Sequence, residues 1–194
     1  MPSKQRVIIV HGWGKGPTTG WFSAVKKRLE ARGFEVVVPA MPNKDAPKMG
    51  AWIKTLSEIV GTPDEQTFLI GHSIGCQTIF RYLASLKKNE CIGGVLSVAG
   101  WFSLTGLRTQ EERRLAKPWL ETPISFEDVK KHASKIVALL SDNDSFVPLE
   151  AHRQIYKEKL NAQVILTHGQ GHIGRAMYAG DVEKAFLKLQ KISH

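Results

Sequence analysis

The chain has 194 residues, enough for one domain with a buried core and too few for two comfortable ones. Hydrophobic residues make up 42% and charged residues 23%, a balance typical of globular proteins and not of disordered chains. The net charge of +9 is spread over lysine pairs at 26–27, 87–88 and 130–131 without interleaved aromatic residues, so we expect no nucleic-acid partner.

No segment approaches the roughly 20 apolar residues that a membrane-spanning helix requires, and we expect no membrane partner. The first ten residues lead directly into a predicted strand and show no signal-peptide pattern. Cys76 and Cys91 stand in neither metal-binding nor redox spacing and are predicted to be reduced thiols. These features predict a cytoplasmic protein, and they leave its oligomeric state, monomer or dimer, open.

Short runs rich in Val, Ile and Leu predict six strands that are covered on both faces, at 7–10, 35–38, 67–70, 94–99, 135–140 and 163–167. Amphipathic segments between them predict helices at 21–31, 49–60, 74–87, 149–160 and 181–191. This alternation predicts an α/β fold with a parallel sheet, helices on both faces and right-handed crossovers.

One connection departs from this alternation, the long segment at 100–134. Such a length between strands is uncommon in a compact domain and often covers a functional site. We therefore predict a single domain over residues 1–194 with an insertion at about 100–134 near the site. An extra surface helix with a loop is the alternative interpretation.

The third predicted strand leads into Gly71-His72-Ser73-Ile74-Gly75, which fits the pattern G-x-S-x-G. In a nucleophile elbow of this pattern, the flanking glycines permit a tight turn that lifts the serine hydroxyl above the sheet. The helix that follows offers free backbone N–H groups and a favourable dipole to an oxyanion. Because a strand precedes the motif and a helix follows it, we predict that Ser73 is a nucleophile.

A serine nucleophile of this type requires an acid and a histidine, which follow it in that order along the chain. The fifth predicted strand ends in SDNDSFVP, where the spacing to Pro148 favours Asp144 over Asp142 as the acid. The sixth ends in THGQGH, where a glycine-flanked loop favours His172 as the base. His168, at the strand terminus, is more typical of a packed structural histidine. Both alternatives remain open at this point.

A glycine-rich loop, HGWGKGPTTGWF, follows the first predicted strand. It does not fit the nucleotide-binding patterns, because Pro17 replaces the third glycine of G-x-G-x-x-G and Gly16 replaces the Ser or Thr of a Walker motif. We expect instead that the loop passes over Ser73. The backbone N–H groups of Trp13 and Ile74 would then form an oxyanion hole.

The histidines of the chain do not predict a metal site. His168 and His172 are four residues apart, but two glycines between them oppose the helix that would align them as ligands. No glutamate follows the first histidine, as H-E-x-x-H requires. We expect neither a metal nor another cofactor, and we expect His11 and His72 to be structural or to line a pocket.

Together these motifs resemble the α/β-hydrolase superfamily, and within it the small serine hydrolases similar to YdeN and to retinoblastoma-binding protein nine. The resemblance spans nearly the whole chain, through the segments HGW, WFSAVKKRLEARGFEV, PAMPN, GHSIG, KPW, DSFVP and GQGH. It implies a triad of Ser73, Asp144 and His172. It also implies a six-stranded sheet of order 2-1-3-4-5-6, without the two antiparallel strands that begin larger members.

The resemblance implies a serine hydrolase that cleaves small or medium acyl esters, with a small-molecule acyl substrate as its partner. Thioesterase, amidase or acyltransferase activity on the same triad is an alternative, and so is an interaction protein on a hydrolase scaffold. Trp101, Phe102 and Trp119 lie at a strand end or in the insertion and are candidates for the substrate pocket. Packing in the core is the alternative for these three aromatic residues.

Overall fold

The computed structural model describes residues 4–133 and 135–192, and its centre is one six-stranded sheet. The strands lie in the order β2-β1-β3-β4-β5-β6 and all pair in parallel, which confirms the predicted topology. Their bounds are β1 (Arg6–Val10), β2 (Glu35–Val37), β3 (Thr67–His72), β4 (Gly94–Val98), β5 (Ile136–Ser141) and β6 (Gln163–Thr167).

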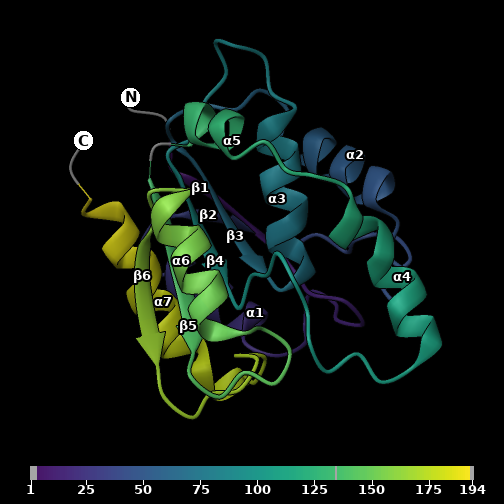
Figure 1. The fold of residues 1–194 in the computed structure, drawn as a ribbon. Coiled ribbons are helices and arrows are strands. Elements are labelled where there is room, and N and C mark those ends of the chain that lie inside the picture. The colour runs from purple at the N-terminus through teal and green to yellow at the C-terminus, as the bar shows by residue number, and fades with distance from the viewer. Residues whose placement is uncertain (1–3, 134, 193–194) are drawn as a thin grey trace.

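Helices cover both faces of the sheet and bury the four central strands, β1, β3, β4 and β5. The edge strands β2 and β6 are partly exposed, so the prediction that all six strands are covered on both faces is wrong for these two. In Figure 1, α6 lies in front of β5 and α7 behind it, and α4 lies at the outer edge beyond α3. No helix in the described part of the chain is long and apolar enough to span a membrane. The helices are α1 (Phe22–Glu30), α2 (Met49–Val60), α3 (Ile74–Ala84), α4 (Gln110–Glu121), α5 (Phe126–His132), α6 (Leu149–Glu158) and α7 (Ala179–Gln190), with a 3-10 turn, η1 (Ala176–Tyr178).

Consecutive residues of the central strands enter two different cores. On β1, Val7 and Ile9 join the cluster that contains Trp21 and other side chains of α1 and α7. Ile8 and Val10 join the cluster on the other face, under α2 and α3. Because side chains alternate along a strand, a sheet covered on both faces needs continuous apolar runs.

The segment after β4 folds into α4 and α5 joined by a short loop, and residue 134, where the predicted insertion ends, lies outside the described residues. A capping box begins α4. Thr109 Oγ1 accepts a hydrogen bond from the Glu112 backbone N–H, and the Glu112 carboxylate accepts one from the Thr109 backbone N–H. α3 ends at Ala84, earlier than predicted. The backbone N–H groups of Ser85 and Leu86 donate to carbonyls three residues before them, a tighter pattern than that of an α-helix.

The start of α3 packs directly on β1, and Gly75 permits this contact. A Cβ atom on Gly75 would lie 2.3 Å from the Val10 carbonyl oxygen and 2.9 Å from that of His11. Backbone atoms of a central strand do not move aside easily, so only glycine fits at this position. The contact fixes the first turn of α3 against the carboxyl end of β1.

We predict that Gly75→Ala lowers the free energy of unfolding by about 1–3 kcal/mol, because the added methyl group has no space. Gly180→Ala is the matched control, since a Cβ atom there meets nothing within 4 Å. In a helix this control should be stabilising by up to about 1 kcal/mol. Urea unfolding of both variants measures the effects, and equal stability of the two would contradict the packing argument.

Candidate active site

Ser73 lies in the sharp turn between β3 and α3, at the carboxyl edge of the sheet. Its backbone has φ 54° and ψ −120°, a conformation that side-chain-bearing residues rarely adopt. Its N–H donates to the Val98 carbonyl at the end of β4, and its own carbonyl accepts from the Cys76 N–H. The turn therefore holds the serine hydroxyl clear of the sheet, as a nucleophile elbow does.

The structure brings His172 and Asp144 together with Ser73. His172 Nε2 lies 2.8 Å from Ser73 Oγ, and His172 Nδ1 lies 2.7 Å from Asp144 Oδ2. The Asp144 side chain is 2% exposed and that of His172 is 24% exposed. A hydroxyl, an imidazole and a buried carboxylate joined in this order can activate the hydroxyl as a nucleophile.

The environment of Asp144 favours its ionised form. Burial alone would raise its pKa, but the hydrogen bond from His172 and those from the Phe146 and Val147 backbone N–H groups outweigh it. The net result is a pKa below the ordinary value of an aspartate. A charged carboxylate beside Nδ1 selects the tautomer that leaves Nε2 free to accept the serine proton.

The competing pair, Asp142 and His168, makes its own contact apart from Ser73. Asp142 Oδ2 lies 2.6 Å from His168 Nδ1, and Asp142 Oδ1 accepts from the Gly169 N–H at 2.9 Å. The His168 side chain is 79% exposed, unlike the packed histidine that its place at a strand end predicts. Among the four residues, only His172 reaches the serine hydroxyl within the described hydrogen bonds.

The loop after β1 passes over Ser73, as predicted. A Cβ atom on Gly12 would lie 3.4 Å from Ser73 Cβ, so the backbone is in close contact with the nucleophile. His11 Nε2 accepts from the Met41 N–H at 3.0 Å, so its Nδ1 carries the proton and donates to the Gly12 carbonyl at 2.9 Å. This carbonyl also accepts from the Lys15 N–H and shares its peptide plane with the Trp13 N–H, so His11 and Lys15 together hold the orientation of that N–H group.

Both predicted oxyanion donors border the site. Trp13 and Ile74 line the cavity around Ser73, and neither backbone N–H donates in the hydrogen bonds of the described chain outside helices and strands. Ile74 is the first residue of α3, where an N–H has no partner inside the helix. Two backbone donors are therefore available next to the serine hydroxyl.

A cavity of about 440 Å³ opens above Ser73 and is mostly apolar. Leu104 and Leu107 of the insertion form part of its wall, together with residues of the loops after β1 and β5. Sequence patterns did not single out these residues, because they lie in loops without periodicity. The lining residues are Gly12, Trp13, Lys15, His72, Ser73, Ile74, Trp101, Leu104, Leu107, Glu112, Phe146, His172 and Gly174.

Of the three predicted pocket aromatics, Trp101 alone borders this cavity. It is buried, and its indole N–H donates to Ser73 Oγ at 3.3 Å. Phe102 stacks instead between Phe80 and His152, and Trp119 packs edge-on against Trp52 in the same core. Successive residues after β4 thus diverge, with Trp101 directed to the serine and Phe102 into the core.

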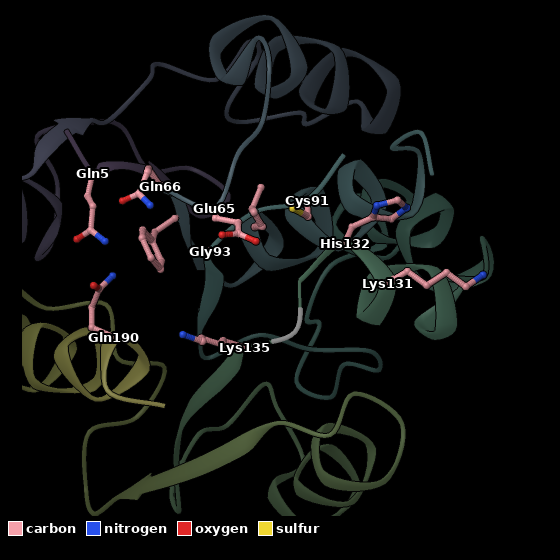
Figure 2. Close-up of a pocket in the computed structure, with 11 residues that line it drawn as sticks. Gln5, Glu65, Gln66, Cys91, Gly93, Lys131, His132, Lys135 and Gln190 are labelled. Carbon is pink, nitrogen blue, oxygen red and sulfur yellow. The ribbon is translucent and has the colours of Figure 1, made fainter. Parts of the chain in front are cut away.

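A second cavity, of about 290 Å³, lies at the opposite edge of the sheet, where strands begin (Figure 2). Figure 2 shows Gln5, Gln66 and Gln190 at one end and Cys91 and His132 toward the other. His132 Nδ1 is hydrogen-bonded to the Glu90 carbonyl, and no described hydrogen bond joins Cys91 to His132. Within residues 4–133 and 135–192, no three His, Cys, Asp or Glu side chains gather as metal ligands.

Comparison with known proteins identifies the family. The family model described as serine hydrolase matches residues 7–191. The chain belongs to the serine hydrolase family. It is 30% identical to YdeN of Bacillus subtilis (strain 168) over 169 residues, which cover 87% of this chain and 85% of that protein. It is 26% identical to the serine hydrolase RBBP9 of Rattus norvegicus over 175 residues, 89% of each chain.

Solved structures of such serine hydrolases and their superfamily share this architecture. The crystal structure of the B. subtilis ydeN gene product has a TM-score of 0.86 at 25% identity, covering 98% of this chain and 100% of that one. Est1E from Butyrivibrio proteoclasticus has a TM-score of 0.74 at 16% identity, covering 99% and 90%, a likeness of fold alone. The chain therefore has an α/β-hydrolase fold, as the resemblance implies.

We predict that His72 makes stability depend on pH below neutrality. Burial, together with the neighbouring His172, lowers the pKa of His72 to about 3. In the unfolded chain a histidine titrates near pH 6.5, so below that pH only the unfolded state takes up this proton and the folded state is disfavoured.

His72→Gln should remove this contribution, which amounts to about 1 kcal/mol per pH unit between pH 6 and 4. Urea unfolding at pH 7, 6, 5 and 4 measures the free energy of unfolding of wild type and variant. The wild type should lose stability more steeply than the variant as the pH falls. Parallel curves would contradict a neutral, buried His72.

Proposed function

We propose that the protein hydrolyses carboxylic esters of small or medium acyl groups, with Ser73 as nucleophile, His172 as base and Asp144 as the acid that orients it. The observation that carries this proposal is the continuous path from Ser73 Oγ through His172 to Asp144, at 2.8 and 2.7 Å. Membership of the serine hydrolase family supports the same assignment.

In the proposed reaction, Ser73 Oγ attacks the ester carbonyl carbon while His172 Nε2 takes the hydroxyl proton. The negative charge on the carbonyl oxygen is bound by the backbone N–H groups of Trp13 and Ile74. Collapse of this intermediate expels the alcohol, which receives the proton from His172, and leaves an acyl group on Ser73. Water, deprotonated by His172, then releases the carboxylic acid.

The lining of the cavity supports an apolar acyl group of limited length. Trp101, Leu104, Leu107 and Phe146 provide an apolar wall around a volume of about 440 Å³, which is at the lower end of small-molecule pockets. Glu112 also lines the cavity, and its Oε2 accepts from the Arg108 and Thr109 backbone N–H groups. Apolar burial of the acyl chain would supply much of the binding energy.

We predict that Ser73→Ala abolishes turnover of p-nitrophenyl butyrate and labelling by a fluorophosphonate probe, because the attacking oxygen is removed. The unfolding temperature should stay within a few degrees of the wild type, since the same backbone turn is retained. A wild type that the probe leaves unlabelled, beside a labelled known hydrolase, would indicate a scaffold without hydrolase activity. A set of matched ester, thioester and amide substrates then ranks the acyl classes.

The acid is tested by comparing Asp144→Asn with Asp142→Asn. Asp144→Asn should lower kcat by roughly 10³–10⁴-fold, because the imidazole loses the carboxylate that selects its tautomer. Asp142→Asn should lower kcat by about tenfold or less, since Asp142 contacts His168 and the Gly169 N–H but not His172. Steady-state kinetics on one ester decides between them, and a larger loss in Asp142→Asn would reverse the assignment.

A further inference from the structure

Three consecutive backbone carbonyls, at residues 172–174, are each contacted by a residue outside their loop. The His172 carbonyl lies 2.9 Å from His72 Nε2, and the Ile173 carbonyl accepts from the Trp21 indole N–H at 2.8 Å. The Gly174 carbonyl lies against Gly20, where a Cβ atom would come within 2.4 Å of its oxygen. We call these contacts the carbonyl clamp.

The clamped loop has a strained backbone. Ile173 has φ 46° and is fully buried, although a β-branched residue with positive φ is a genuine outlier. Such conformations persist only where the surrounding contacts over-determine them, and they concentrate at functional sites. The residue before Ile173 is His172, whose imidazole contacts Ser73 Oγ. The strain therefore lies where a small backbone change would displace the imidazole.

The opposite edge of the same loop is held by side chains at the end of β5 and just after it. Ser141 Oγ accepts from the Gln170 N–H at 3.1 Å, and Asn143 Oδ1 accepts from the Gly171 N–H at 2.7 Å. These acceptors hold the N–H groups ahead of His172, whereas the carbonyl clamp holds the carbonyls from His172 onward. The loop is thus restrained on both sides of the histidine.

His72 is suited to be a fixed donor in this clamp. A carbonyl oxygen only accepts, so His72 Nε2 carries the proton. Nδ1 of the neutral ring is then bare, and it is buried with no hydrogen-bond partner in residues 4–133 and 135–192. The ring lies edge-on to Trp21 and to Phe22, with centroids 5.9 and 5.8 Å away. These two aromatic side chains are themselves buried, so the ring has no other position to occupy.

We propose that His72 and Trp21 are positioning residues, which hold the His172 imidazole over Ser73 through the backbone of residues 172–174. This inference rests on the proposed function of His172 as the base. Neither residue transfers a proton. Each fixes one carbonyl of the strained loop, and together with the Asp144 carboxylate and the contacts of Ser141 and Asn143 they hold the imidazole in place.

The experiment compares donors with shape-matched residues that lack the donor. His72→Gln retains an amide N–H near the position of Nε2, whereas His72→Leu removes it; Trp21→Phe keeps an aromatic ring without the indole N–H. A displacement of the imidazole by about 1 Å costs on the order of 100-fold in rate. We therefore expect kcat to fall about 100-fold in His72→Leu and at least tenfold in Trp21→Phe, with His72→Gln within tenfold of wild type.

The split between kcat and KM distinguishes positioning from general damage. Trp21 does not line the cavity, so Trp21→Phe should change KM for p-nitrophenyl butyrate by less than threefold while kcat falls. Phe22→Leu is the control, because Phe22 packs on His72 but donates no hydrogen bond to the loop. Phe22→Leu loses packing against His72 comparable to that lost in Trp21→Phe, and its kcat should stay near that of the wild type.

Each outcome decides the question. Thermal unfolding is recorded for every variant, and if His72→Leu does not fold, Trp21→Phe against Phe22→Leu gives the answer. The positioning role of the carbonyl clamp would be overturned if His72→Leu and Trp21→Phe fold and keep the wild-type kcat. It would also be overturned if kcat falls as far in Phe22→Leu as in Trp21→Phe. Neither result would affect the proposed function. A wild type that neither turns over the ester nor reacts with the fluorophosphonate probe would overturn the proposed function, and the clamp's role with it.

Discussion

The turn at Ser73 is the constraint on which the rest of the site depends. A residue with φ 54° joins β3 to α3, and the next glycine lets the helix meet the backbone of β1. Because Gly75 approaches the Val10 and His11 carbonyls so closely, the first turn of α3 has a single position relative to the loop after β1. The start of α3 at Ile74 and the loop that carries Trp13 consequently border the same cavity as Ser73.

The parallel sheet explains why residues distant in sequence meet at this turn. The carboxyl ends of β3, β5 and β6 lie at one edge of the sheet, so Ser73, Asp144 and His172 each follow a strand and converge there. Figure 1 shows the loops after β5 and β6 together at this edge. Asp142 and Asp144, two residues apart, then contact two different histidines: one pair is exposed and ties the loops together, the other is buried and reaches the serine.

Sequence patterns were sufficient for the parts of the molecule that depend on local chemistry. The parallel sheet, the turn at Ser73 and the close passage of the loop after β1 each follow from glycine positions and continuous apolar runs, whereas the strand order was implied by the family resemblance. Which aromatic residues border the site and which pack in the core was not predictable in this way. Trp101 and Phe102 are adjacent and equally apolar, yet one contacts Ser73 Oγ and the other stacks on His152. That difference depends on how the insertion packs, which no periodicity in residues 100–109 encodes.

Two buried histidines, His11 and His152, act as fixed connectors between backbone segments. A neutral imidazole carries one donor and one acceptor on opposite sides of a rigid ring, so it can join two backbone groups that cannot reach each other. His11 joins the Met41 N–H to the Gly12 carbonyl, and His152 joins the Phe102 N–H to the Pro148 carbonyl.

This use of histidine requires that the rings stay neutral, because a protonated ring would present a second N–H to a backbone donor. Burial lowers the pKa of His11 and of His152 below that of an ordinary histidine, which meets the requirement. His72 is neutral for the same reason and uses its donor side, on the His172 carbonyl, while its buried Nδ1 has no hydrogen-bond partner among the described residues.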